Sequence, residues 1–182
     1  MEEVAKRARH KGLDAVIITD HDVLYEGPSE IYGVKILRGE EVSSSAGHIL
    51  ALFVEERIPP GLSVGETIDR IHEAGGIAIA AHPFDKLRKG IGKLVYKFDF
   101  DGIEGYNGYE ALPRANKKAI KAAKELNKPI TAGTDAHYAP HVGYCYMIVE
   151  ELTPEGILRG TPVCKKVPLI KRLKVYVKRK FR

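Results

Sequence analysis

The chain has 182 residues with 44% hydrophobic content, enough for one sizeable core and too little for two comfortable domains. It contains no apolar run of about 18 residues, the length that spans a bilayer. Its first residues resemble a charged helix rather than a signal peptide, so we expect a cytoplasmic protein. Only two cysteines occur, Cys145 and Cys164, and their spacing indicates neither a disulfide framework nor a zinc ribbon.

The formal net charge of +5 comes from the C-terminal end of the chain. Residues 165–182 contain nine basic and no acidic side chains, which leaves 20 basic against 24 acidic residues elsewhere. Such a run can bind nucleic acid or another anionic surface, or it can be a solvated tail. Residues 173–178 also alternate apolar and basic side chains, as an edge strand does. We therefore divide the chain into a domain over residues 1–160 and a basic tail over residues 161–182.

The first half of the chain predicts a helix followed by a sheet. A helix over residues 4–10 ends at Lys11-Gly12 and leads into a short apolar strand over residues 15–19. Further strands are expected near residues 34–42 and 48–54. The small residues between them predict a hairpin that places Glu41 beside His48. Ser63 and Glu66 then form the capping box of a helix that runs to Ala74.

The second half alternates strands with helices. Strands are expected over residues 77–81, 102–106, 129–133 and 144–149, with a helix over residues 115–126. Thr153 and Pro154 have the residue types of a helix cap and a first helical position. Because strand–helix–strand alternation produces parallel sheets with crossover helices, about seven strands predict a small β/α barrel.

Several histidines and carboxylates stand where a predicted strand gives way to a loop. Imidazole and carboxylate are ligands that zinc, manganese and iron share, and a barrel gathers the carboxyl ends of its strands at one mouth. A single histidine of this kind is more often a core residue with backbone hydrogen bonds, but coincidence explains a whole set poorly. We therefore predict a polynuclear metal site. Its candidate residues are Asp20, His21, Glu41, His48, His82, Asp135 and His137.

The other histidines receive different interpretations. His72 lies inside a predicted helix and His10 at the end of one, so both are expected to be surface or packing residues; His141 fits either role. Two cations about 3.5–4 Å apart need an anionic bridge, which Glu41 or Asp135 could supply, and such pairs hydrolyse phosphate esters. The sequence lacks the phosphate-binding loop of nucleotide triphosphatases and the nucleophile elbow of serine hydrolases.

Four segments resemble the motifs of the PHP family, the polymerase-and-histidinol-phosphatase metal phosphoesterases. They are residues 17–22, 39–43, 80–83 and 133–137, and their order and spacing agree with the family from about Glu2 to Leu158. The resemblance implies a distorted (β/α)7 TIM-like barrel. It also implies two or three divalent ions of zinc, manganese or iron, and the hydrolysis of phosphate esters.

Carried over position by position, the resemblance implies a ligand set. Glu41 would bridge the ions, and Asp20 would orient an imidazole rather than bind metal. Asp20, Glu41 and Asp135 are then the carboxylates expected to take part in catalysis. The metal ligands implied are His21, Glu41, His48, His82, Asp135 and His137.

One motif of the family has no counterpart in this sequence. A strand carrying His-x-His should precede Glu2, so two or more ligands are missing and the barrel is expected to be short of its first strand. Either the protein starts upstream of Met1, or the chain is a naturally degenerate member. A missing strand would leave unpaired edges on its neighbours, which favours a homo-oligomer.

Two hypotheses about function follow. The first is a metal-dependent phosphoesterase that hydrolyses small phosphomonoesters or short nucleotide phosphodiesters through a metal-activated water, with Arg38, Lys86 and Arg88 as candidate phosphate contacts. The second is a catalytically impaired PHP-like barrel that acts as a nucleic-acid-binding or scaffold protein through its basic tail. Neither hypothesis requires a membrane partner.

Overall fold

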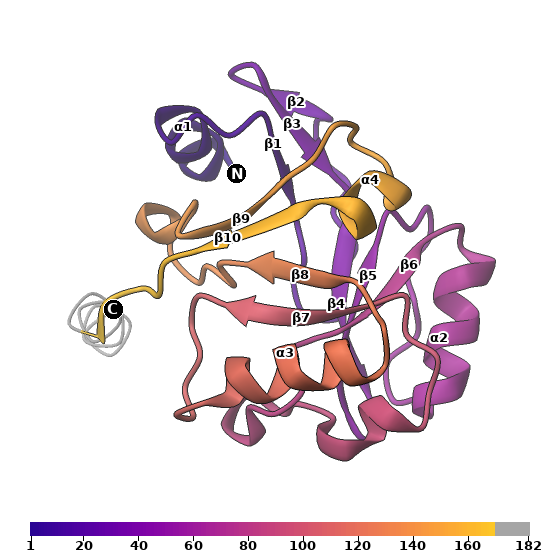
Figure 1. Ribbon diagram of the computed structural model, residues 1–182. Coiled ribbons are helices and arrows are strands. Elements are labelled where there is room, and N and C mark those ends of the chain that lie inside the picture. Colours follow the sequence, from indigo (N-terminus) through magenta and orange to yellow (C-terminus); the bar gives the residue numbers. More distant parts are fainter. Residues whose placement is uncertain (170–182) are drawn as a thin grey trace, which may run out of the picture.

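A computed structural model of the chain describes residues 1–169 (Figure 1). The predicted edge strand over residues 173–178 lies outside this range. In chain order the elements are α1 (Glu2–His10), β1 (Ala15–Ile17), β2 (Glu30–Ile31), β3 (Val34–Leu37), β4 (Gly39–Ser44), β5 (Gly47–Leu52), α2 (Val64–Glu73), β6 (Ile77–Ala80), the 3₁₀ helices η1 (Lys86–Arg88) and η2 (Gly92–Tyr96), β7 (Gly102–Asn107), α3 (Ala115–Glu125), β8 (Ile130–Gly133), the 3₁₀ helix η3 (Ala139–His141), β9 (Cys145–Ile148), α4 (Pro154–Arg159) and β10 (Thr161–Cys164).

The helix ends follow local chemistry. At the start of α2, the Ser63 side chain accepts a hydrogen bond from the Glu66 N–H, and the Glu66 carboxylate accepts one from the Ser63 N–H, which confirms the predicted capping box. At α4, the Thr153 hydroxyl caps the helix and Pro154 occupies its first turn, as predicted. None of the described helices is long and apolar enough to cross a membrane.

The largest sheet has five strands in the order β4-β5-β6-β7-β8. β6, β7 and β8 are parallel, and β5 is antiparallel to both β4 and β6. β4 therefore runs in the same direction as β6, β7 and β8, and the carboxyl ends of these four strands lie at one edge. The arrowheads of β7 and β8 in Figure 1 point toward this edge, and α3 packs along β7.

A second sheet joins the first through a nearly continuous stretch of chain. Its order is β1-β3-β2, with β1 parallel to β3, and β4 follows β3 after one residue. After β1, the chain continues alongside the end of β3 and along β4. The Ile18 N–H donates to the Leu37 carbonyl, and His21 forms an isolated parallel bridge with Glu41. The loop after β1 is thereby aligned with the carboxyl-terminal half of β4.

The described strands do not close into a barrel. β9 and β10 form a separate antiparallel pair that lies next to β8. The fold is mixed α/β with open sheets, so the prediction of a closed (β/α)7 barrel is corrected. Alternation of strands and helices sets the strand directions, but closure depends on pairing between segments far apart in the chain.

The region assigned to the basic tail begins with a strand. Its first four residues form β10, which pairs with β9. Cys145 and Cys164 are directly opposed in this pair and form a disulfide, which corrects the expectation of no disulfide. Spacing in the sequence could not show this, because the two cysteines meet only through the register of β9 and β10.

The main hydrophobic core lies where α2 and α3 pack against the five-stranded sheet. All four residues of β6 are buried, as expected for a central strand covered on both faces. The core includes Ile49 of β5, Ile71 of α2, Ala78 of β6, Ile103 of β7 and Ala122 of α3. This packing gives the carboxyl edge of the sheet a rigid base.

Candidate metal centre

Glu41 stands at the centre of a group of histidines. Its side chain lies on β4 and is 5% exposed. Its Oε1 is 2.8 Å from His48 Nδ1 and 3.0 Å from His82 Nε2, and its Oε2 is 3.7 Å from His21 Nε2. We call His21, Glu41, His48 and His82 the Glu41 cluster. It unites residues from four segments that the sequence analysis selected.

The hairpin between β4 and β5 explains the contact between Glu41 and His48. In its register Glu41 is opposite Leu50, and His48 is opposite Ser43. Glu41 and His48 are therefore diagonal neighbours on one face, close to the expected side-by-side arrangement. Gly47, whose φ is +144°, lets the hairpin turn lie against the loop after β6, because a Cβ at this position would overlap the Lys89 carbonyl oxygen.

The residues of this cluster fit a divalent cation. One ligand atom from each of His21, Glu41 and His48 lies within 4.8 Å of the other two. His48 Nδ1 is buried and has no hydrogen bond, although it lies close to the Glu41 carboxylate; His82 Nδ1 is likewise buried without one. An unsatisfied buried nitrogen is costly, and coordination would satisfy His48 Nδ1. Two imidazoles and a carboxylate suit zinc, manganese or iron.

The electrostatics favour a charged Glu41. Burial alone would raise its pKa, but the neighbouring His48 and His82 imidazoles outweigh burial and hold the pKa of Glu41 well below its usual range. Burial would likewise lower the pKa of His82, but Glu41, Glu104 and Asp135 raise it above its ordinary value. The cluster is thus a buried anion surrounded by imidazoles, and a cation entering it would displace protons.

Asp135 and His137 form a separate group in the loop after β8, residues 134–137, which we call the Asp135 loop. The His137 Nδ1–H donates to the Asp135 carbonyl oxygen at 2.8 Å, and the same nitrogen lies 3.5 Å from Asp135 Oδ1. Asp135 has a φ of +57°, a left-handed conformation unusual for a residue with a Cβ. The structure brings this loop close enough to influence His82 electrostatically.

Arg88 neutralises Asp135. One guanidinium nitrogen lies 2.5 Å from Asp135 Oδ2, and both side chains are only 14% exposed. The guanidinium also lies over the Tyr109 ring, 5.7 Å from its centroid. Arg88 belongs to η1, in the loop after β6. The Asp85 carboxylate anchors this loop by accepting hydrogen bonds from the backbone N–H groups of Ala111 and Leu112.

Several other residues considered in the sequence analysis make no described side-chain contact with the Glu41 cluster. Asp20 is exposed and no described hydrogen bond joins its carboxylate to an imidazole; its carbonyl accepts from the Glu41 N–H instead. Among the candidate phosphate contacts, Arg38 and Lys86 are exposed. His72 pairs with Asp101 away from the cluster, as expected of a surface residue. His141, for which two roles were open, is buried and hydrogen-bonded to the Tyr109 hydroxyl.

The sequence analysis overlooked two buried polar residues of β7. Glu104 is 3% exposed and Asn107 is fully buried. The Glu104 carboxylate accepts a hydrogen bond from the His82 N–H, and the Asn107 side chain donates to both Glu104 and Asp135. Burial raises the pKa of Glu104 to about 7. A carboxylate inside a predicted buried strand was the available signal, because such groups are almost never fully buried without partners.

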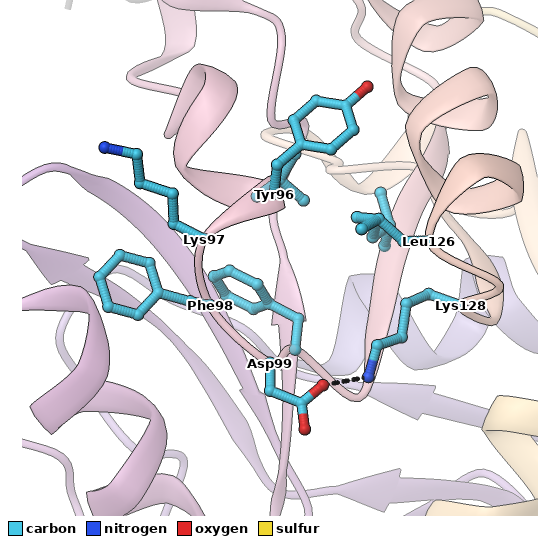
Figure 2. A pocket seen from close by; sticks show the side chains of 9 residues that line it. Tyr96, Lys97, Phe98, Asp99, Leu126 and Lys128 are labelled. Carbon is cyan, nitrogen blue, oxygen red and sulfur yellow. Dashed lines mark hydrogen bonds and ion pairs between the residues drawn. The ribbon is translucent and has the colours of Figure 1, made fainter.

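A hollow of about 310 Å³ lies elsewhere, between the segment before β7 and the end of α3 (Figure 2). It is lined mainly by Tyr96, Phe98, Phe100, Leu126 and the aliphatic part of Lys128, whose ammonium group pairs with Asp99. None of its lining residues belongs to the Glu41 cluster or the Asp135 loop. The hollow is therefore separate from the candidate metal centre.

Comparison with known proteins identifies relatives of this chain. A family model described as PHP-associated matches residues 113–160. The uncharacterized protein MJ1587 of Methanocaldococcus jannaschii is 39% identical over 129 residues, which cover 68% of this chain and 75% of that protein. An identity of this level over most of both chains indicates common ancestry.

Solved structures share the fold. A two-domain protein from Bacteroides vulgatus, which contains a predicted PHP-like metal-dependent phosphoesterase, matches with a TM-score of 0.65 and 18% identity over 90% of this chain and 60% of its own. A candidate metal-dependent phosphoesterase from Bifidobacterium adolescentis matches with a TM-score of 0.59 and 18% identity over 94% of this chain and 92% of its own. At these identities the likeness concerns the fold alone.

The mixed α/β fold is that of PHP-like proteins, and the Glu41 cluster is a candidate metal site within it. The chain belongs to the same family as MJ1587, and its residues 113–160 match the PHP-associated family model.

Proposed function

We propose that this protein is a metal-dependent phosphoesterase whose centre is the Glu41 cluster. The observation that carries the proposal is the buried Glu41 carboxylate, which lies within 3.0 Å of His48 and His82 and 3.7 Å of His21. The names of the two structural neighbours support the same chemistry. The Asp135 loop would add Asp135 and His137, so that the full candidate set holds two or three zinc, manganese or iron ions.

The residues of the cluster would have different roles in metal binding. Glu41 would bridge, because its two oxygens face different histidines and its charge is favoured there. His21, His48 and His82 would offer ring nitrogens. A bound divalent cation supplies Lewis acidity toward a phosphoryl oxygen and lowers the pKa of a water molecule. One carboxylate oxygen of Asp135 is already paired with Arg88, and the other oxygen would be the one that binds a cation.

Arg88 is the phosphate contact that the structure supports best among the three candidates. Its guanidinium already binds a carboxylate oxygen at 2.5 Å, and a phosphate oxygen offers the same charge and a similar geometry. The partial burial of the pair strengthens such an interaction relative to an exposed one. A substrate phosphate would therefore share the guanidinium with Asp135 or take it over.

The substrate class remains that of small phosphomonoesters or short nucleotide phosphodiesters. Metal content and turnover test the proposal together: the purified protein is stripped with a chelator, reloaded with manganese or zinc, and analysed for metal. Its hydrolysis of an aryl phosphate monoester and of a diaryl phosphate diester is then measured. We expect at least two ions per chain and turnover of one of the two esters. Failure to bind metal would refute the proposal.

The alternative function, nucleic-acid binding through the basic residues 165–182, rests on charge alone, since most of these residues lie outside the described range. Binding of a short single-stranded oligonucleotide, measured from 50 to 300 mM salt, separates the two. A steep linear fall of log affinity with log salt, without hydrolysis in the presence of metal, would favour the alternative.

A further inference from the structure

Glu104 and Asn107 occupy one face of β7 because the strand is irregular. Side chains three residues apart normally point to opposite faces of a strand. Here the pairing with β8 shifts between Glu104 and Tyr106, so that Gly105 is an extra residue. The irregularity turns Glu104 and Asn107 toward the same side. Gly105 permits it, because a Cβ there would lie 2.6 Å from Ile130 Cγ2.

The two side chains connect two loops that carry candidate ligands. Glu104 Oε2 accepts a hydrogen bond from the His82 N–H at 2.8 Å. The Asn107 amide donates to both Glu104 oxygens at 3.2 Å and to Asp135 Oδ2 at 2.9 Å. The Tyr109 N–H donates to the other end of the Asn107 amide, at 2.8 Å, and so fixes the direction in which the amide points.

Both connected residues have unusual backbone conformations. His82 has a φ of +29° and Asp135 a φ of +57°, values that side chains with a Cβ rarely adopt. Such conformations persist where the surroundings determine them strongly. At His82 the buried Glu104 holds the backbone N–H directly, and at Asp135 the Asn107 amide holds one carboxylate oxygen.

We propose that Glu104 and Asn107 form a positioning bracket, built on β7, that fixes His82 and Asp135 relative to one another for metal binding. The bracket is not itself a ligand. It leaves His82 Nε2 directed at Glu41 and keeps Asp135 Oδ2 engaged, so that Oδ1 faces His137. It thereby couples the Glu41 cluster to the Asp135 loop.

This inference rests on the proposed metal centre, and its test must separate the two. Glu104→Gln keeps the size of the side chain but removes its charge and replaces one carboxylate oxygen by an NH₂ group, which donates and cannot accept, so that the His82 N–H and the Asn107 amide lose one of their two acceptor oxygens. Asn107→Ala removes the other member and serves if the first variant folds poorly. Glu40→Gln is the matched control, because Glu40 is also buried and accepts a backbone hydrogen bond, from Ile58 at 2.6 Å, but forms no described hydrogen bond with His82, Asn107 or Asp135.

The measurements are the affinity for manganese by calorimetry, the visible spectrum of the cobalt-loaded protein, and the unfolding temperature of the metal-free protein. We expect both bracket variants to bind at least one cation about ten-fold or more weakly and to change the cobalt spectrum. Glu40→Gln should change only the unfolding temperature. Wild-type affinity and spectrum in both bracket variants would overturn the inference while the proposed function stands. A wild-type protein that binds no cation would overturn both.

Discussion

The Glu41 cluster and the Asp135 loop use the same ligand types in different ways. In the cluster, strand register places a buried carboxylate among three imidazoles, and within the described residues no lysine or arginine forms an ion pair with it. In the loop, a carboxylate in a left-handed conformation is already neutralised by Arg88 and held by Asn107. The difference suggests that one half of the site is ready for a cation, whereas the other must exchange a partner to accept one.

The largest effect is expected from removing the central charge. Glu41→Gln keeps the size of the side chain but removes the anion that the histidines surround, so metal affinity should fall by at least about a hundred-fold and turnover should be lost. Elemental analysis after gel filtration and an ester hydrolysis assay would measure this. A variant that keeps full metal content would contradict the central role of Glu41, and Glu40→Gln provides the control on the same strand.

A histidine of the cluster should matter more than one outside it. His82→Ala removes a ring 3.0 Å from Glu41, and we expect it to lower bound metal substantially. His72→Ala removes a ring that contacts Asp101 at the surface and should leave metal content unchanged. Equal metal content in both variants would show that the cluster has been assigned wrongly.

Changing the loop should produce a partial loss. Asp135→Asn removes the negative charge but leaves the Glu41 cluster intact, so we expect one cation to be lost while the others remain. Calorimetric titration with manganese would show a reduced stoichiometry rather than a uniform loss of affinity. A complete loss of binding would mean that the two regions form one inseparable site.

Replacing Arg88 should have the smallest effect. The change should weaken substrate binding without weakening cation binding. In Arg88→Met a charged hydrogen bond to the substrate phosphate is lost, which should raise KM about ten-fold. The same change frees Asp135 from its ion pair, so cation affinity should hold or increase. A fall in metal affinity with an unchanged KM would reverse the role proposed for Arg88.

Local sequence patterns were enough to predict several helix ends and strands of this protein. The Ser63 capping box, the Thr153–Pro154 helix start and the short apolar run before His82 all describe neighbouring residues, and the structure confirms these elements. The side-chain types at strand ends also selected the members of the Glu41 cluster. Such signals are reliable because caps and periodicity depend on contacts within a few residues.

Only the tertiary structure decided how distant segments pair. The open sheets, the β9–β10 pair and the contact of Arg88 with Asp135 depend on pairing between separate segments of the chain. The two cysteines of the Cys145–Cys164 disulfide, for example, are 19 positions apart. The role of Glu104 likewise depends on the extra residue at Gly105, which changes the face of the strand to which Asn107 points. Register and long-range packing set these features, because a shift of one residue reverses the direction of every following side chain.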